Sequence, residues 1–357
     1  MKESVLVTSC GGPAAENVIK NLKLVKNRPK IYGIDVDPWM AFLSSADRRF
    51  QVDRADSPKY VEQLQDLIKC LNISLLIPQS DAEVYTISKQ REQFDTKIIL
   101  PNHYVIKLCQ DKGKLYDYLK DRRIPLPAYK NPTPDDIRAL SLESPNYGVW
   151  SPSQWKYPCW VRARHGAGGN KGFVCRDWRD LRNMVEFYRG REEIDWQMVR
   201  FLEGRNLSWT SLWNQGELVT SVLKERLKWV YDRIGTTAIQ RTIYNDEVNE
   251  YCELIVKAVR ELDPKLTGIM MLDMKQDSET KDHYVTEINA GRLGTVNYFY
   301  GYTSKEIFGD DRLNFPWLMW LISKGQKLPE LPKFNAFPQG LYWLRHIDMG
   351  YKLVDNA

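Results

Sequence analysis

The sequence predicts an α/β domain built on a parallel sheet, followed by a mixed α+β region. Two observations carry this prediction. Short apolar runs alternate with amphipathic segments up to about residue 100, and β–α–β–α–β alternation is typical of a doubly wound parallel sheet. Beyond the Pro-rich connection that ends near residue 150, strand-like segments follow one another across polar turns.

The first region contains an alternating series of strands and helices. Residues 4–9 form an apolar run that ends in the turn "CGGP", and the following segment places Val18, Leu22 and Val25 on one helical face. The expected elements are strands over 4–9, 30–37, 73–80 and 97–101, with helices over 13–25 and 60–72. The last of these strands would close the first domain near residue 100.

The remaining region mixes helices with strand pairs. Helical spacing predicts helices over 111–124 and 245–262, and a hairpin turn is expected at Asn214–Gly216. Further strands are expected over 158–164 and 172–177, which flank a glycine-rich segment, and over 267–277 and 283–294, which a polar turn separates.

Composition excludes several classes of protein. The 357 residues are 43% hydrophobic and 27% charged with a net charge of +5, values of an ordinary globular protein with no long basic run for nucleic acid. Nothing resembles a signal peptide, and no stretch approaches the roughly 18 apolar residues of a membrane span. Six scattered cysteines and four distant histidines argue for reduced thiols and against a zinc site.

The segment "VRARHGAGGNKGF" (Val161–Phe173) concentrates glycine among positive charges. Glycine in such numbers has an entropic cost that calls for a reason. The residues concerned are Arg162, Arg164, Gly166, Gly168, Gly169, Lys171 and Gly172. One interpretation is a surface hairpin turn, and the other is a mobile flap whose backbone N–H groups approach an anion.

This segment fits neither of two common phosphate loops. It lacks the G-x-x-x-x-G-K-[ST] order, and it joins two strands instead of opening a helix. The N-terminal "SCGGPAAEN" does lie between a strand and a helix, with Asp35 and Asp37 ending the next strand. Its glycines are adjacent, so this dinucleotide fingerprint is incomplete, and a nicotinamide-dependent dehydrogenase remains an alternative.

A group of oxygen ligands lies on the two expected strands toward the C-terminal part of the chain. Glu287 and Asn289 are two residues apart in "VTEINA", so their side chains share a face of a strand. An antiparallel neighbour could place Asp273, from "GIMMLDMK", beside them. Two carboxylates and an amide oxygen suit Mg²⁺ that is also bound by nucleotide phosphates. Alternatively, they are polar residues on a solvated strand face.

Taken in order, these motifs resemble those of the ATP-grasp superfamily, in the branch similar to one half of the carbamoyl-phosphate synthase large subunit. The resemblance covers about residues 4–325 and includes "DKGKLYDYLKDRRIPLP", the glycine segment with its flanking strands, "QMVRFLEG", "LDMK" and "TEINAGRLG". It implies a Rossmann-like N-terminal domain, the pre-ATP-grasp domain, over 1–105. It further implies a small lobe over 106–195, a large lobe over 196–325 and a C-terminal tail over 326–357.

The resemblance also implies roles for individual residues. Lys112 and Arg162 would contact the ATP phosphates, and the flap residues Gly166, Gly168, Gly169, Lys171 and Gly172 would cover them. The segment Met198, Val199, Arg200, Phe201 and Leu202 would surround the adenine, and Asp273, Glu287 and Asn289 would bind Mg²⁺, with Mn²⁺ as a second candidate. Where many members have an acid that binds the ribose, this chain has Asn206.

The implied function is an ATP- and Mg²⁺-dependent carboxylate–amine ligase that forms an acyl phosphate and then an amide. Arg292, displaced by one residue in "EINAGR", would reach the acyl phosphate, and Arg226 and Arg233 could hold a substrate carboxylate. The expected partners are small molecules, without nucleic acid or membrane, in a cytoplasmic protein for which a homodimer is left open. The alternatives are phosphorylation of bicarbonate or carbamate, as in carbamoyl-phosphate synthase, and nucleotide binding without catalysis.

Overall fold

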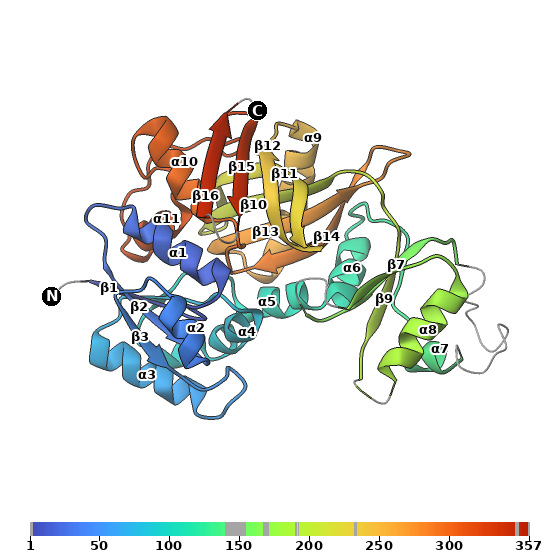
Figure 1. Cartoon of the computed structure of the whole chain (residues 1–357), viewed down its shortest axis with the longest axis horizontal. Coiled ribbons are helices and arrows are strands. Elements are labelled where there is room, and N and C mark those ends of the chain that lie inside the picture. The colour runs from blue at the N-terminus through green and yellow to red at the C-terminus, as the bar shows by residue number, and fades with distance from the viewer. Residues whose placement is uncertain are drawn as a thin grey trace. The chain divides into compact units, whose positions relative to one another are not determined.

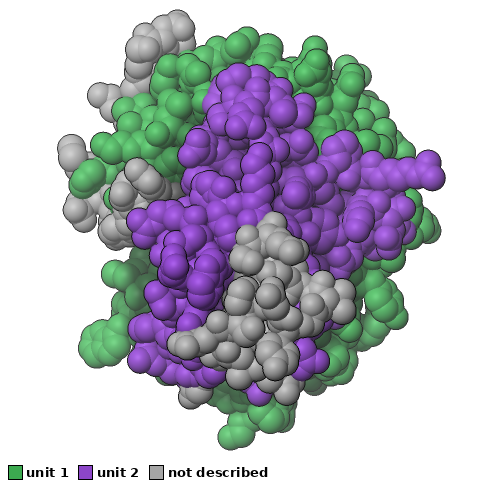
Figure 2. All heavy atoms as spheres, turned by 90° about the vertical axis from the view of Figure 1, so that its right-hand side faces the viewer, with its two compact units in different colours: residues 1–107, 206–273, 288–357 green, residues 108–205, 274–287 purple. Residues whose placement is uncertain are grey.

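The computed structural model describes residues 3–139, 155–166, 171–189, 191, 193–231, 234–346 and 350–355. The chain divides into two compact units, coloured separately in Figure 2. Unit 1 comprises residues 1–107, 206–273 and 288–357, and unit 2 comprises residues 108–205 and 274–287. Among the helices of the described residues, none has the length and apolar character needed to cross a membrane. The expected boundaries at 105, 195 and 325 stay predictions.

Unit 1 begins with a five-stranded sheet in the order β3-β2-β1-β4-β5 (Figure 1). All four neighbouring pairs are parallel. The strands are β1 (Ser4–Val7), β2 (Lys30–Asp35), β3 (Arg48–Gln51), β4 (Leu75–Ile77) and β5 (Lys97–Ile98). The helices are α1 (Pro13–Lys23), α2 (Pro38–Leu43), α3 (Tyr60–Leu71), α4 (Asp81–Lys89) and α5 (His103–Gln110). The strand order reverses between β1 and β4, the place where sheets of this kind bind ligands.

Local sequence explains where two of these helices begin. The Asp37 carboxylate accepts hydrogen bonds from the amides of Trp39 and Met40, and Pro38 follows as the first residue of α2. At α4, the Ser80 hydroxyl and the Glu83 carboxylate satisfy each other's backbone amides in a capping box. Both helices were missed in the sequence prediction, although both signals are present in it.

Unit 2 contains a four-stranded sheet in the order β6-β9-β7-β8. Its strands are β6 (Tyr129–Lys130), β7 (Cys159–Ala163), β8 (Gly172–Cys175) and β9 (Trp196–Arg200), and its helices are α6 (Lys112–Asp121), α7 (Pro134–Ala139) and α8 (Trp178–Tyr188). Alternate residues of β7 and β9, including Val161 and Met198, pack with Leu181 and Val185 of α8 in an apolar core. The opposite face carries Arg162 and Gln197, which are directly paired across β7 and β9.

A seven-stranded sheet has the order β14-β13-β10-β11-β12-β15-β16. Its strands are β10 (Asn206–Asn214), β11 (Glu217–Tyr231), β12 (Ile234–Thr242), β13 (Gly268–Gln276), β14 (His283–Ala290), β15 (Leu341–His346) and β16 (Gly350–Asp355). The predicted hairpin turn is confirmed, because Gln215 and Gly216, between β10 and β11, both have positive φ. The C-terminal tail thus supplies two strands of this sheet, where the sequence predicted one short strand.

Helices α9 (Asp246–Val259), α10 (Tyr298–Phe308) and α11 (Phe315–Ser323) complete the fold. In unit 1 a single apolar core joins α1 with α10 and α11, as Figure 1 shows from their adjacent ribbons. Phe299, Phe315 and Trp343 are fully buried in it. The predicted fold class, a parallel α/β sheet first and mixed α+β structure afterwards, is confirmed.

Candidate functional site

Arg162 lies on β7 with its side chain held by a neutral partner. Its Nε and one terminal nitrogen donate to Oε1 of Gln197 at 2.9 and 2.8 Å. Only 8% of Arg162 is exposed, and its guanidinium lies 5.6 Å from the centroid of the Tyr116 ring. An amide oxygen orients the guanidinium without neutralising it, so Arg162 keeps a full charge for an anion.

Lys112 is the first residue of α6, and its buried side chain crosses to the glycine segment. Nζ donates to the Gly166 carbonyl at 2.7 Å and lies 3.6 Å from Oε2 of Glu287. Gln197 also donates to the Lys112 carbonyl at 3.1 Å. Unit 2 therefore brings together four of the residues predicted from the sequence. Lys112 contacts Gly166 and Glu287 directly, and Gln197 links it to Arg162.

Arg164 has a structural role that the sequence left open. Both Asp111 carboxylate oxygens accept from Arg164, at 2.9 and 2.8 Å, and Asp111 also caps α6 through the amides of Gly113 and Lys114. A Cβ at Gly113 would overlap the Arg164 side chain, so this glycine makes room for the ion pair. Burial would raise the pKa of Asp111, but the hydrogen bonds and charge of Arg164 together with the Lys114 amide hold it below the ordinary value.

The glycines of the segment differ in what they do. Gly166 has φ of +104° and, among the described residues, no neighbour within 4 Å of a Cβ position, whereas a Cβ at Gly172 would overlap the Trp160 ring. Gly172 therefore lets β8 pack against the Trp160 ring, and Gly166 allows a backbone conformation with positive φ. The Lys171 carbonyl accepts from the Ala163 amide at 3.0 Å, which closes the β7–β8 pair. Gly168 and Gly169 lie outside the described residues.

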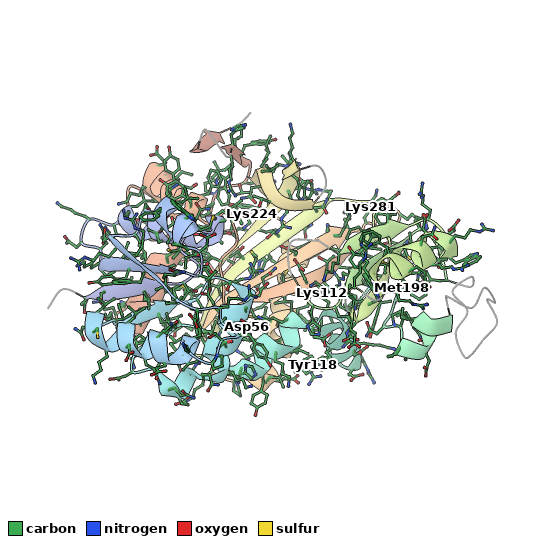
Figure 3. All side chains as sticks on the ribbon, turned by 60° about the horizontal axis from the view of Figure 1, so that its bottom comes forward. Asp56, Lys112, Tyr118, Met198, Lys224 and Lys281 are labelled. Atoms are coloured by element: carbon green, nitrogen blue, oxygen red, sulfur yellow. The ribbon has the colours of Figure 1, made fainter. Side chains whose placement is uncertain are left out.

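The segment expected around adenine leaves β9 and passes toward β10. Met198 is fully buried in the core with α8, so only its backbone could face a ligand (Figure 3). Arg200 forms an ion pair of 2.7 Å with Asp277, and the Lys275 ammonium lies 5.6 Å from the Phe201 ring centroid. Among the described residues, the Phe201 and Leu202 amides have no hydrogen-bond partner. Val199 is 5% exposed and shares a sheet face with Arg162.

In unit 1, two arginines predicted to act on substrate donate hydrogen bonds to residues predicted to bind the metal. Arg226 donates to Oδ1 of Asp273 at 2.5 Å, and both side chains are largely buried. Arg292 donates to Oδ1 of Asn289 at 2.5 Å and forms an ion pair with Asp81 at the start of α4. Asp81 was not singled out in the sequence, because its partner is more than two hundred residues away. Arg233 lies outside the described residues.

The three residues predicted to bind a metal lie on β13 and β14, and this assignment stays a prediction. Glu287 and Asn289 are partly exposed on one face of β14, while Ile288 between them is buried. Asp273 lies on β13, the neighbouring strand in the sheet, and is 9% exposed. The set contains two carboxylates and one amide oxygen, which are Mg²⁺ ligands. Asn206 lies at the start of β10, directly opposite Arg226 of β11.

Lys224 is a buried cation that the sequence analysis missed. Lys224 is labelled in Figure 3. Its side chain is fully buried, and its ammonium donates to the hydroxyls of Thr210, at 3.0 Å, and Tyr300. Burial, with the charge of Arg226 second, lowers the pKa of Lys224 to about 7. Strand alternation could have found it, since Lys224 and Arg226 are two residues apart and therefore share a face.

Helix α2 occupies the space beside the N-terminal glycine turn, where a dinucleotide phosphate would otherwise lie. A Cβ at Gly11 would overlap the Met40 carbonyl of α2, and the Gly11 amide donates to Asp35 at 2.9 Å. Gly11 therefore leaves room for α2 to pack against the β1–α1 turn, and its hydrogen bond to Asp35 ties the turn to β2. The dehydrogenase alternative loses its main support, because the features that suggested a dinucleotide site serve packing.

Two family models match the chain. A model of the PylC-like N-terminal domain matches residues 5–100, and a model of the ATP-grasp domain matches residues 109–296. No curated protein sequence matches.

Solved structures share the fold at low sequence identity. The L-amino acid ligase from Bacillus licheniformis is 12% identical with a TM-score of 0.68, over 96% of this chain and 79% of that one. Carboxyaminoimidazole ribonucleotide synthase from Aspergillus clavatus, complexed with ATP, is 14% identical with a TM-score of 0.69, over 96% and 81%. A biotin carboxylase–ATP complex from Campylobacter jejuni is 14% identical with a TM-score of 0.67, over 96% and 75%.

Proposed function

The chain belongs to the ATP-grasp family, and from this premise we propose that it is an ADP-forming carboxylate–amine ligase. It would use Mg·ATP to convert a carboxylate into an acyl phosphate, which an amine then converts into an amide. The low identity of the solved relatives restricts their support to the fold. The argument for the reaction therefore depends on this chain's own residues.

One observation carries the proposal: each predicted metal ligand has a basic partner of the kind that binds phosphate or carboxylate. Glu287 pairs with Lys112, Asp273 with Arg226, and Asn289 with Arg292. Oxygen ligands paired with cations can exchange partners when a divalent cation and an anionic substrate arrive together. The total charge then stays balanced, which limits the desolvation cost of a closed site.

In the proposed reaction the protein positions charge and provides no nucleophile. Asp273, Glu287 and Asn289 would hold Mg²⁺, whose positive charge would offset the phosphate charge that repels the attacking carboxylate. Arg162 and Lys112 would hold the triphosphate, of which only the γ-phosphoryl group is transferred. The Phe201 and Leu202 amides, which have no hydrogen-bond partner among the described residues, would be available to the adenine edge. Arg292 then orients the acyl phosphate, and Asp81 beside it can accept a proton from the incoming amine. The flap would exclude the water that hydrolyses an acyl phosphate.

The test is a phosphate-release assay with Mg·ATP and paired panels of small carboxylates and amines. The proposal expects ADP and phosphate only with particular pairs, and an amide product that contains both partners. AMP and pyrophosphate as products would contradict the acyl-phosphate route. Turnover with bicarbonate in place of the organic carboxylate would favour the carbamoyl-phosphate-type alternative, and tight ATP binding without any turnover would favour the non-catalytic one.

A pair of variants checks the metal assignment in the same assay. Glu287→Gln keeps the shape of the side chain but removes its charge, and we expect the Mg²⁺ requirement to rise at least tenfold. The control is Glu217→Gln, whose carboxylate is 78% exposed at the start of β11. Equal Mg²⁺ dependence in both variants would remove Glu287 from the metal site.

A further inference from the structure

Large apolar side chains on and next to helix α2 face solvent. Of the twelve large apolar side chains that are exposed among the described residues, five lie within residues 36–43: Val36, Trp39, Met40, Phe42 and Leu43. Trp39 is 78% exposed, and Phe42 and Leu43 are each 69% exposed. The ring centroids of Trp39 and Phe42 are 6.3 Å apart, so the two rings belong to one surface. We call these five residues the α2 patch.

The patch is exposed because α2 packs through its small residue and its backbone. Ala41 is the one buried residue of this six-residue helix. The backbone of the N-terminal turn approaches the helix so closely that a Cβ at Gly11 would overlap the Met40 carbonyl. A surface helix ordinarily turns its apolar side chains toward the core. Single exposed apolar residues need no explanation, but a contiguous group of them marks an interaction surface.

Both ends of α2 are bound to the neighbouring edge strand β3, and Figure 1 shows the helix beside β2 and β3. Gln51 of β3 donates to the Val36 carbonyl, which precedes the helix, at 3.2 Å. Arg49 of β3 donates to the Ser44 carbonyl, which follows the helix, at 2.9 Å. A surface that is already fixed in this way loses little conformational entropy when it binds a partner.

The size and composition of the patch fit a second copy of this chain. At these exposed fractions the five side chains offer about 500–600 Å², since a fully exposed aromatic side chain presents about 150–250 Å². Two such patches in contact would bury about 1,000–1,200 Å², the lower limit for a specific interface. The six residues of α2 include no charge, as is typical of the centre of a homodimer interface. A membrane surface fits less well, because interfacial helices carry a basic face.

Opposite charges lie at the two ends of α2. Asp37 caps its first turn, and Arg49 reaches the carbonyl after its last residue. Both residues are exposed, and neither forms an ion pair among the described residues. Two parallel copies of α2 would place like charges together, whereas two antiparallel copies would place Asp37 of each near Arg49 of the other.

We propose that the α2 patch binds the α2 patch of a second copy of this chain, with the two helices antiparallel. Analytical ultracentrifugation of the full chain over about 1–200 μM tests this. The mass should rise with concentration from 41.8 kDa toward twice that value, because an interface of this size gives a Kd in the micromolar range, about 1–100 μM. A single species of monomer mass throughout would overturn the proposal.

Two matched variants identify the surface. Phe42→Glu introduces a charge into the apolar centre of the interface twice, once from each copy, and should raise the Kd of the dimer at least about tenfold. Tyr104→Glu on α5 changes a side chain that is 71% exposed but lies outside the patch, and it should leave the Kd unchanged. A dimer that both variants weaken equally, or that neither weakens, would overturn the proposal. So would a monomer that sediments with phosphatidylcholine vesicles and loses this binding in Phe42→Glu.

Arg49→Glu tests the antiparallel arrangement. It would set two carboxylates against each other at both ends of the paired helices, so the Kd should rise about threefold to tenfold at about 0.05 M salt. The rise should be smaller at about 1 M salt, where the Debye length is about 3 Å. An equal rise at both salt concentrations would exclude the antiparallel arrangement. None of these measurements requires turnover, so the dimer stands or falls independently of the proposed ligase reaction.

Discussion

Arg162 in unit 2 and Arg226 in unit 1 are the same residue type in similar positions, yet they are held differently. Each lies within a strand, and each side chain is largely buried. Arg162 is bound by the neutral amide of Gln197, whereas Arg226 is bound by the carboxylate of Asp273. An arginine bound by a neutral amide can bind an anionic ligand directly. An arginine bound by a carboxylate can do so only after that carboxylate binds another cation.

The two arginines would become able to bind an anionic ligand in two different ways. Arg162 would bind phosphate whether or not a metal ion is present, because nothing has to leave. Arg226 and Arg292 would become available together with metal binding, because Asp273 and Asn289 would turn to the metal. Variants of Arg162 and Gln197 test this distinction directly, and variants of two glycines and of Lys224 test the packing and charge around it, from the largest expected effect to the smallest.

Arg162→Met should have the largest effect. Loss of the uncompensated charge should lower kcat/KM for ATP by about 10²–10³, the range seen when one preorganised donor to a developing charge is removed. Steady-state phosphate release measures this, with Arg176→Met as the control because its side chain is 82% exposed. A loss of less than threefold would place Arg162 outside the phosphate site.

Gly172→Ala tests whether this flap glycine serves packing. The new methyl group would overlap the Trp160 ring, so we expect the free energy of unfolding to fall by about 1–3 kcal/mol. Gly166→Ala adds a methyl group in open space and should cost only the strain of a positive φ, about 1 kcal/mol. Denaturant titration of both variants checks the order, and a more destabilised Gly166→Ala would reverse the assignment.

Gln197→Glu converts the environment of Arg162 into that of Arg226. The added carboxylate would offset the guanidinium charge and repel the triphosphate, so the KM for ATP should rise about tenfold, or about 1.4 kcal/mol. Gln197→Met removes the same hydrogen bonds without adding charge and should raise the KM less. If both variants behave alike, the neutrality of the partner is not what matters.

Lys224 should produce the smallest effect, visible as a pH dependence of stability. Its pKa is about 7 in the folded state and near the ordinary 10.5 when unfolded, so between these values the unfolded chain binds more protons. The free energy of unfolding should therefore rise by about 1 kcal/mol from pH 7 to pH 8, relative to Lys224→Met. Thermal or denaturant unfolding at both pH values measures this, and a difference that falls with pH would exclude the shifted pKa.

The elements predicted correctly from the sequence are those with a clear apolar periodicity or an apolar run bounded by a polar turn. Apolar periodicity predicted α1, α3 and α9 to within a few residues, and β13 and β14 were expected from their apolar runs and polar turn. Short helices were missed for the opposite reason, because six residues of α2 are too few to show a 3.6-residue period. The caps of α2 and α4 were the usable signals there.

The arrangement of the site depended on contacts that local sequence does not encode. Arg164 was left open because its partner Asp111 lies 53 positions away and needs Gly113 to make room. Local sequence also gives no sign that Gln240 lies directly between Arg226 and Trp343, because only the strand register brings the three together. The metal and phosphate assignments came from resemblance to a family, and they stay predictions until the variants above are measured.

The register of β15 has a consequence for the order in which the protein is made. Trp343 of β15 is directly opposite Gln240 of β12, and it lies beyond residue 296, where the match to the ATP-grasp domain stops. A chain synthesised from its N-terminus therefore exposes β12 as a bare sheet edge until β15 emerges from the ribosome. During that interval the nascent protein would already hold Lys112 and Arg162 but would lack β15 and β16, the last two strands of its seven-stranded sheet.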